Sequence, residues 1–169
     1  ASAIGKEWDE QAVAFAEYVI GKTAADVTGI AQVEKDGHNV ASDADLAAIC
    51  SMDITDMKAA VAAAVANATD MGAQAGDVLG LGVVTGVSAS AADADAAGKI
   101  QHDSTFAATT KNAEGAITSN FVNVTQTKYT VSAEGVAECT TPTVTPKYEL
   151  GADYGMLKAS AIGKEWFEQ

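Results

Sequence analysis

The chain has 169 residues, with 10 lysines, no arginine, 23 Asp plus Glu and a formal net charge of -13. A surface of this sign repels nucleic-acid phosphates and anionic membranes, and the missing arginines remove the usual bidentate clamp for anionic substrates. No apolar run approaches the roughly 18 residues that a spanning helix needs. We therefore expect neither a nucleic-acid partner nor membrane insertion.

The first 71 residues are predicted to form a helical half. Five apolar residues at helical spacing predict a core-facing first helix that stops at Gly21. They are Ile4, Trp8, Ala12, Phe15 and Val19. Residues 23–29 are predicted to form a short helix capped by Thr23, and Asp36-Gly37 marks a turn.

Two further helices are expected before the composition changes. Ser42 and Asp45 stand three positions apart, close to the pattern of a capping box, and predict a short helix. Asp53, with Asp56 in the first turn, is predicted to cap an Ala-rich helix that Gly72 closes.

After a linker at residues 72–77 the pattern changes to strands. Residues 78–87 are Val-rich and predict a strand, and residues 89–98 predict a small-residue acidic loop. Four more extended segments follow, separated by turns at residues 112–115 and 133–135. They are residues 104–110, 116–127, 128–131 and 136–143. Pro142 and Pro146 place the last one at a sheet edge.

Helices and strands in separate blocks predict the α+β class. We expect a helical half of three to four helices, residues 1–71, packed on an antiparallel sheet of about four to five strands, residues 78–158, in one shared core. Such a helical half buries too little by itself to be stable.

The two ends of the chain carry the same segment. Residues 1–11 read ASAIGKEWDEQ and residues 159–169 read ASAIGKEWFEQ, which differ only where Asp9 is replaced by Phe167. The offset of 158 residues is the size of a domain and not of a solenoid repeat. Residues 159–169 are therefore predicted to start the first helix of a next repeat, in a chain cut through, or permuted around, a repeating module.

Three segments carry a resemblance to a known family. They are VVT at residues 83–85, FAATTKNAEGAITSNFVNVTQTKY at 106–129 and KYELGADYGMLKASAIGKEW at 147–166. They resemble exported bacterial proteins related to the FMN-binding domain family, and the resemblance covers almost the whole chain. In that family the sheet comes first, and the helical segments GKEW, GKTAADVTGIA and DADLAAICSMDIT follow.

The resemblance implies FMN as a cofactor to consider. Family members that hold FMN covalently attach it to the Thr of a Ser-Gly-Ala-Thr motif. The matching residues 50–55, CSMDIT, contain Ser51 but neither the Gly, the Ala nor a Thr at the fourth place. Covalent flavin is therefore not expected, and the Asp53 carboxylate would be a poor neighbour for a phosphate.

Other chemistry has weaker support. Gly80 and Gly82, followed by Thr85, lack the third glycine of a dinucleotide fingerprint. His38, beside a turn and near Asp36, and His102, near Asp103, are both expected to be surface histidines. Ser104 and Thr105 follow His102 and Asp103, but neighbours along a strand point to opposite faces and form no catalytic relay. Four acidic residues are expected to form a solvated face and not a cation site: Asp93, Asp95, Glu138 and Glu149.

Cys50 and Cys139 lie outside any zinc spacing and leave open one disulfide or two free thiols. Trp8 and Trp166 are expected to anchor their helices in a core. We expect no catalytic residues, no metal and no enzymatic activity.

Two functions remain. The first is a non-catalytic extracellular or cell-surface repeat module that assembles head to tail with copies of itself, as a filament or array. Its assembly residues are predicted to be Ile4, Trp8, Phe15, Ile162, Trp166 and Phe167. The alternative is a noncovalent FMN-binding or small-ligand redox module.

Overall fold

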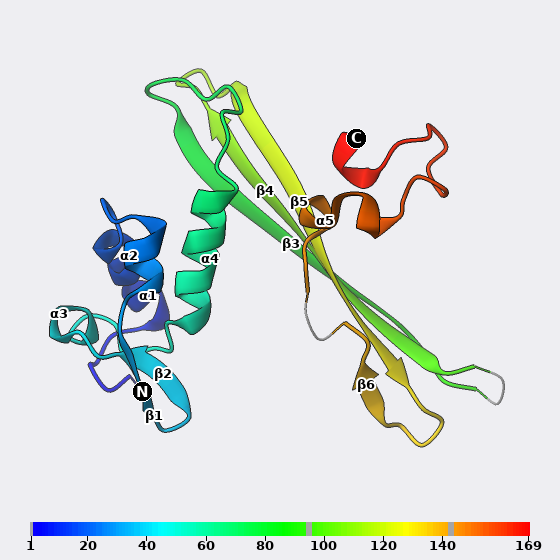
Figure 1. The fold of residues 1–169 in the computed structure, drawn as a ribbon, viewed down its shortest axis with the longest axis horizontal. Coiled ribbons are helices and arrows are strands. Elements are labelled where there is room, and N and C mark those ends of the chain that lie inside the picture. The colour runs from blue at the N-terminus through cyan, green and yellow to red at the C-terminus, as the bar shows by residue number, and fades with distance from the viewer. Residues whose placement is uncertain (1, 94–95, 142–143) are drawn as a thin grey trace. The chain divides into compact units, whose positions relative to one another are not determined.

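The computed structural model describes residues 2–93, 96–141 and 144–169. The chain divides into two units, Ala1–Thr69 and Asp70–Gln169. The first unit is mainly helical and the second is built on an antiparallel sheet (Figure 1). The chain therefore has a mixed α+β fold, as the order of helical and strand patterns predicted.

In its described residues, 2–69, the first unit contains four helices and one hairpin. In chain order these are α1 (Trp8–Tyr18), α2 (Ala24–Thr28), β1 (Gln32–Lys35), β2 (His38–Ala41), α3 (Ala44–Ala47) and α4 (Thr55–Ala66). The core of this unit is made of side chains with exposures of 3% or less. They are Phe15, Val27, Ala41, Leu46, Cys50 and Ile54.

The β1–β2 hairpin explains the Asp-Gly turn. Lys35 pairs with His38, so the loop has two residues, Asp36 and Gly37, with φ of 55° and 83°. Two consecutive positive φ values are those of the tight turn that matches the twist of paired strands. The sequence analysis predicted the turn but neither strand.

Helix capping follows the predictions in part. Thr23 caps α2 and forms a reciprocal capping box with Asp26. The prediction for α3 is wrong by one residue, because Asp43, not Ser42, accepts the hydrogen bonds from the first turn. The helix α4 ends at Ala66 and not at Gly72.

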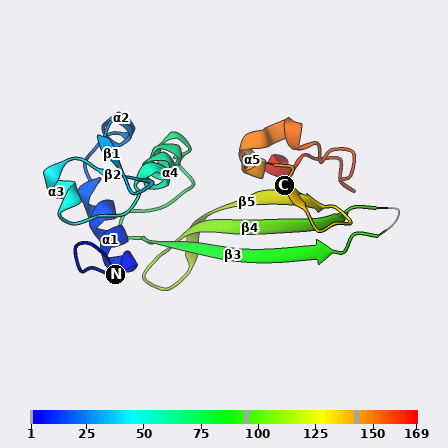
Figure 2. The ribbon, with the colours of Figure 1, turned by 90° about the horizontal axis from the view of Figure 1, so that it is seen from below.

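The second unit contains a four-stranded antiparallel sheet in the order β3-β4-β5-β6. The strands are β3 (Val78–Ser90), β4 (Gly98–Lys111), β5 (Ile117–Val131) and β6 (Ala137–Cys139). Three short helical segments follow: α5 (Lys147–Leu150), η1 (Gly151–Tyr154) and η2 (Trp166–Glu168). Both views place α5 beside β5 (Figures 1 and 2).

The strands are longer than the sequence indicated. β3 continues to Ser90, into the predicted acidic loop, and β4 begins at Gly98 instead of residue 104. The predicted strands at residues 116–127 and 128–131 form one strand, β5, because its pairing with β4 runs without a break past residues 127–128 and shifts register only between Thr110 and Lys111. The predicted last strand, residues 136–143, contains the short strand β6, and its residues 142–143 lie outside the described residues.

The sheet is covered mainly along β5. Phe121 packs edge-on against Tyr148 of α5, with ring centroids 5.0 Å apart. Asn123 donates to the Glu149 carboxylate at 2.7 Å and accepts from the Tyr148 amide at 3.1 Å. Among the described residues of this unit no hydrophobic side chain is fully buried. The sheet is therefore a single layer with large exposed apolar surfaces.

Candidate functional site

The repeated segment has the same local conformation at both ends of the chain. The Gly5 amide donates to the Ser2 carbonyl at 3.1 Å, and the Gly163 amide donates to the Ser160 carbonyl at 3.1 Å. Both glycines have positive φ, +69° and +64°, in a region that other residues rarely adopt. The turn is therefore specified by the segment itself, in two different surroundings.

The helix start after this turn is also the same in both copies. Glu7 and Glu10 form a reciprocal capping box, in which the Glu7 amide donates to the Glu10 carboxylate at 2.7 Å. Glu165 and Glu168 form the same box, again at 2.7 Å. Each box satisfies amides that a helix start leaves free. In the second copy the box precedes only the single turn η2, and that this turn starts the first helix of a next repeat stays a prediction.

The last residue of each copy folds back on its own segment. Gln11 Nε2 donates to Ser2 Oγ at 3.1 Å and to the Lys6 carbonyl at 3.0 Å. The second copy repeats both bonds, at 3.3 and 3.0 Å, through Gln169, Ser160 and Lys164. The side-chain amide is therefore oriented in the same way in both copies, with Nε2 held and Oε1 directed away.

The two copies differ in what meets that Oε1 atom. Gln11 Oε1 accepts from the Ser51 amide at 2.8 Å and from Ser51 Oγ at 3.1 Å. These bonds hold the segment on the helical unit, and Gln11 is 3% exposed. Gln169 is exposed, and its Oε1 has no hydrogen-bond partner among the described residues.

The second copy has contacts on its other side. The Glu165 carboxylate accepts from the Met156 amide at 2.9 Å, and Glu165 is 8% exposed. This bond joins the segment to the chain that follows η1. It leaves the Oε1 atom of Gln169 free, so one segment can contact the sheet unit through Glu165 and still present the acceptor that binds Ser51 in the first copy.

The prediction that Trp8 anchors its helix in a core is wrong, because Trp8 is 70% exposed. Trp8 lies on the same face of α1 as the buried Phe15. However, α1 begins at Trp8, and there its apolar face borders an open hollow of about 910 Å³. Ile4, Val40 and Met52 also line the hollow. The apolar face therefore continues beyond the side chains that cover it.

The other predicted assembly residues differ in exposure. Phe15 belongs to the core and is not available to a partner. Ile162 and Phe167 are 67% and 42% exposed, and Trp166 is half-buried. The second copy thus presents apolar side chains at its surface, whereas the first copy presents Trp8.

Residues 50–55, which the sequence analysis compared with a flavin attachment motif, do not fit a phosphate group. Asp53 accepts from the Asn39 amide at 2.8 Å and from the Thr55 amide at 2.9 Å. The Asn39 amide, followed by Thr55, lowers the pKa of Asp53, so the carboxylate stays negative. Asp53 thus holds the start of α4, although the formal cap is Ile54, and Asp56 lies in the first turn as predicted.

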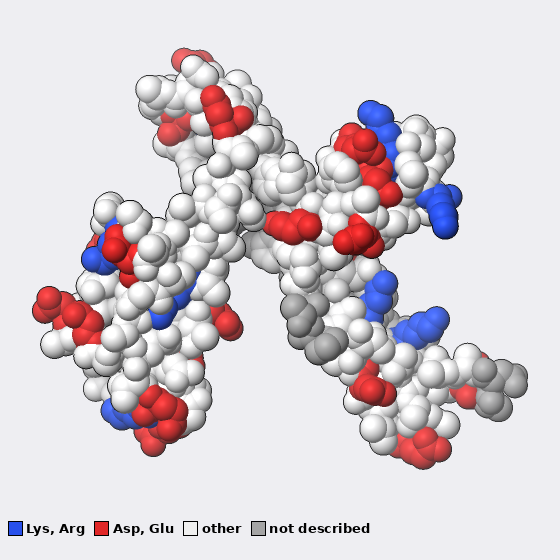
Figure 3. Space-filling view, in the orientation of Figure 1, with Lys and Arg blue, Asp and Glu red and all other residues white. Residues whose placement is uncertain are grey.

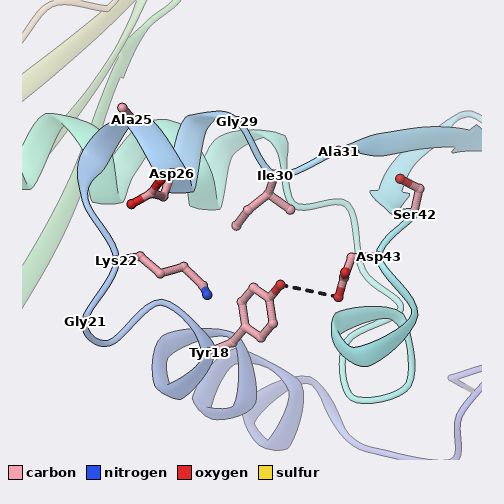
Figure 4. A pocket seen from close by; sticks show the side chains of 10 residues that line it. All are labelled: Tyr18, Gly21, Lys22, Ala25, Asp26, Gly29, Ile30, Ala31, Ser42 and Asp43. Atoms are coloured by element: carbon pink, nitrogen blue, oxygen red, sulfur yellow. Dashed lines mark hydrogen bonds between the residues drawn. The ribbon is translucent and has the colours of Figure 1, made fainter.

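A second hollow, of about 650 Å³, lies between α1, α2 and the start of α3 (Figure 4). The Tyr18 hydroxyl donates to Asp43 at 3.3 Å, and the Lys22 ammonium lies over the Tyr18 ring, 4.4 Å from its centroid. Asp26 is held by Thr23. Tyr18, Lys22, Asp26 and Asp43 in this hollow are thus engaged by partners within the unit.

The remaining candidates do not assemble. His102 and Asp103 are neighbours in β4, and Asp103 accepts from Gln101 and Gln126, both at 2.8 Å. No cluster of metal-ligating side chains exists among residues 2–93, 96–141 and 144–169, while Asp95 falls outside them. Gly80 and Gly82 lie within the extended strand β3, where they pair with Thr109 and Ala107.

The sequence left open whether the two cysteines form a disulfide. Both cysteines are free thiols, Cys50 in the core of the first unit and Cys139 in β6. The charged residues are scattered, and Figure 3 shows no basic patch on the face that it draws. Within the described parts of the chain, every helix is too short or too polar to cross a membrane.

Comparisons identify no relative. The chain matches no protein-family model, and no curated protein or solved structure is significantly similar to it. The function must therefore be argued from the residues.

Sequence reasoning missed Gln11, Gln169 and Ser51 as site residues. A signal was present, because the repeat keeps its final glutamine while position nine changes from Asp9 to Phe167. Ser51 carries no such signal, since only the fold brings it to residue 11.

Proposed function

We propose that the chain is a non-catalytic structural module that joins head to tail with copies of itself. In this model residues 159–169 of one copy take the place that residues 1–11 occupy on the helical unit of the next copy. The observation that carries the proposal is the equal conformation of the two segments, down to the orientation of Gln11 and Gln169.

The contact would use groups that are already in position. Gln169 Oε1 would accept from the Ser51 amide and hydroxyl of the next copy, as Gln11 does within one chain. Because Nε2 of Gln169 is already held by its own segment, little side-chain freedom is lost on binding. Trp166 would take the position of Trp8 beside the open hollow.

Such a contact is heterologous, because the donor and acceptor surfaces differ. Heterologous contacts that do not close into a ring generate open arrays or filaments. The resemblance to exported bacterial proteins supports a location outside the cell or at its surface. The acidic surface, with a net charge of -13, keeps such a module soluble between contacts.

The donor segment competes with residues 1–11 of the acceptor chain. A covalently attached segment has an effective concentration in the millimolar range, so exchange between copies requires high protein concentration or a weakened resident segment. This competition makes two matched substitutions act in opposite directions. Gln11→Ala weakens the resident segment and should promote assembly, whereas Gln169→Ala weakens the donor and should reduce it.

The experiment is sedimentation equilibrium over a concentration series of the full chain, both variants and a chain ending at Lys158. The weight-average mass should rise most steeply with concentration for Gln11→Ala. It should rise less for the full chain and least for Gln169→Ala and the truncated chain. Equal masses for the full and truncated chains would overturn the proposal, as would an unchanged mass for both substitutions.

A further inference from the structure

The edge strand β3 is exposed over its whole length. All 13 residues from Val78 to Ser90 are exposed, and among the described residues the strand pairs only with β4. It contains no charged residue and no proline, and its pairing with β4 has no bulge. Natural sheets usually block edges with these devices, because a free edge offers unpaired amides and carbonyls to another chain.

The strands at the opposite edge of the sheet differ from β3 in length and cover. The last strand, β6, has only three residues and pairs with one end of β5. Elsewhere along β5, Tyr148 and Glu149 of α5 contact the side chains of Phe121 and Asn123 and so cover one face of the strand. Most residues of β5 are therefore at least partly buried, whereas every residue of β3 is exposed.

The sequence of β3 is nearly symmetric about Val84. On the face that carries Val84, glycines stand two residues to either side, at Gly82 and Gly86. On the other face, Leu81 stands three residues before Val84 and Val87 three residues after it. Both faces alternate with the period of a strand. An antiparallel copy of β3 centred on Val84 would thus bring matching residue types opposite each other.

We propose that β3 strands of two copies pair antiparallel across a twofold axis at Val84, which joins two four-stranded sheets into one. Glycine would face glycine at positions 82 and 86, and Leu81 would face Val87. Val84 would face its own symmetry mate, a β-branched pair that suits adjacent strands. The free backbone groups of β3 would form the hydrogen bonds of an antiparallel ladder.

A second copy fits this edge better than an unrelated strand. A twofold contact requires a self-complementary surface, and the symmetry about Val84 supplies it. The chain carries a net charge of -13, which opposes self-association, yet no charge lies anywhere on β3. Copies can therefore approach along this edge with less electrostatic repulsion than along charged parts of the surface.

This contact is separate from the head-to-tail contact of the proposed function. It is isologous and closes at two copies, whereas the exchange of residues 159–169 is open-ended. It uses neither Gln169 nor Ser51. The two contacts are distinguished in the full chain carrying Gln169→Ala, which should still form the β3 pair.

The test places a charge at the symmetry axis. In the Gln169→Ala chain, Val84→Lys alone and Val84→Glu alone should each weaken dimerisation by at least about tenfold, because like charges meet directly across the strands. Val84 is 74% exposed, so neither change disturbs a core. An equimolar mixture of the two variants should restore a mass of two chains in sedimentation equilibrium, which a folding defect would not allow.

The matched control is Val122→Lys, on a strand away from this edge. Val122 pairs with Ala107, which pairs with Gly82, so its side chain lies on the same sheet face as Val84. It is 40% exposed and should leave dimerisation unchanged. A monomeric Gln169→Ala chain, a Val84→Lys chain that dimerises normally, or no rescue in the mixture would overturn the proposal. Loss of dimers in Val122→Lys alone would also overturn it.

Discussion

The bond between Gln11 and Ser51 is the attachment of the first repeated segment to the helical unit. Replacing Gln11 with Ala removes the acceptor of the Ser51 amide and hydroxyl, at 2.8 and 3.1 Å. It also removes the two bonds that Nε2 makes within the segment. The equivalent change, Gln169→Ala, removes the corresponding Nε2 bonds but touches no partner of Oε1.

This pair isolates the energy of the Ser51 contact. A part-buried amide that loses its acceptor destabilises a fold by about 1 to 3 kcal/mol. Because Gln11 is 3% exposed, little water replaces its bonds, and we expect a loss of about 2 kcal/mol for Gln11→Ala. Gln169 is exposed, and exposed substitutions stay within about 0.5 kcal/mol.

Urea unfolding followed by the helical circular dichroism signal measures this difference, because the two longest helices, α1 and α4, belong to the first unit. The measurement is made at low protein concentration, where copies do not exchange segments. Hydrogen exchange at the Ser51 amide gives a local reading, which should become faster only in Gln11→Ala. Equal unfolding free energies for the two variants would show that Ser51 does not hold the segment.

Three further predictions concern the helical unit and its ligands. Leu46→Ala, at a side chain with 0% exposure, should lower the free energy of unfolding by about 2 to 5 kcal/mol, while Val13→Ala, at 58% exposure, should change it by less than about 0.5 kcal/mol in the same urea titration. In the folded protein the pKa of Asp53 lies below its unfolded value of about 3.9, because Asn39 and Thr55 donate to the carboxylate. The stabilisation that Asp53 provides is therefore complete above about pH 4 and is lost as the pH falls through the folded pKa. In Asp53→Asn the unfolding midpoint should depend less on pH in the acid range, and an unchanged pH profile would contradict this. The purified protein should show no absorption bands of oxidised flavin, and none should remain with it when FMN is added and then removed by gel filtration. Bands that persist after gel filtration would support the flavin alternative instead.

Elements with strong local signals were predictable from the sequence. Thr23 has Asp26 three residues later, so the reciprocal bonds that start α2 need no distant partner. The repeated segment behaves in the same way, because its glycine turn and paired glutamates are contained within eleven residues. The identical residues of the two copies therefore predicted the same conformation at both ends of the chain.

Features that depend on distant partners were not predictable. The stripe that contains Trp8 and Phe15 indicated a buried face, but periodicity does not show where the covering side chains end. The length of β5 is determined by its pairing with β4, so the change of composition near Lys128 was mistaken for a strand boundary. The strands around Asp36 are short and polar, and only their pairing defines them.

The exposed sheet connects stability to assembly. Every fully buried hydrophobic side chain among the described residues belongs to the first unit, so the second unit depends on strand pairing and on the cover that α5 gives to Phe121. Any contact that forms only with the folded sheet stabilises it by mass action. Pairing through β3 would remove the free edge where local opening of the sheet can start, and binding through residues 159–169 would tie down the segment that follows η1. In the proposed assembly, the exposed surfaces of one copy would thus become a source of stability.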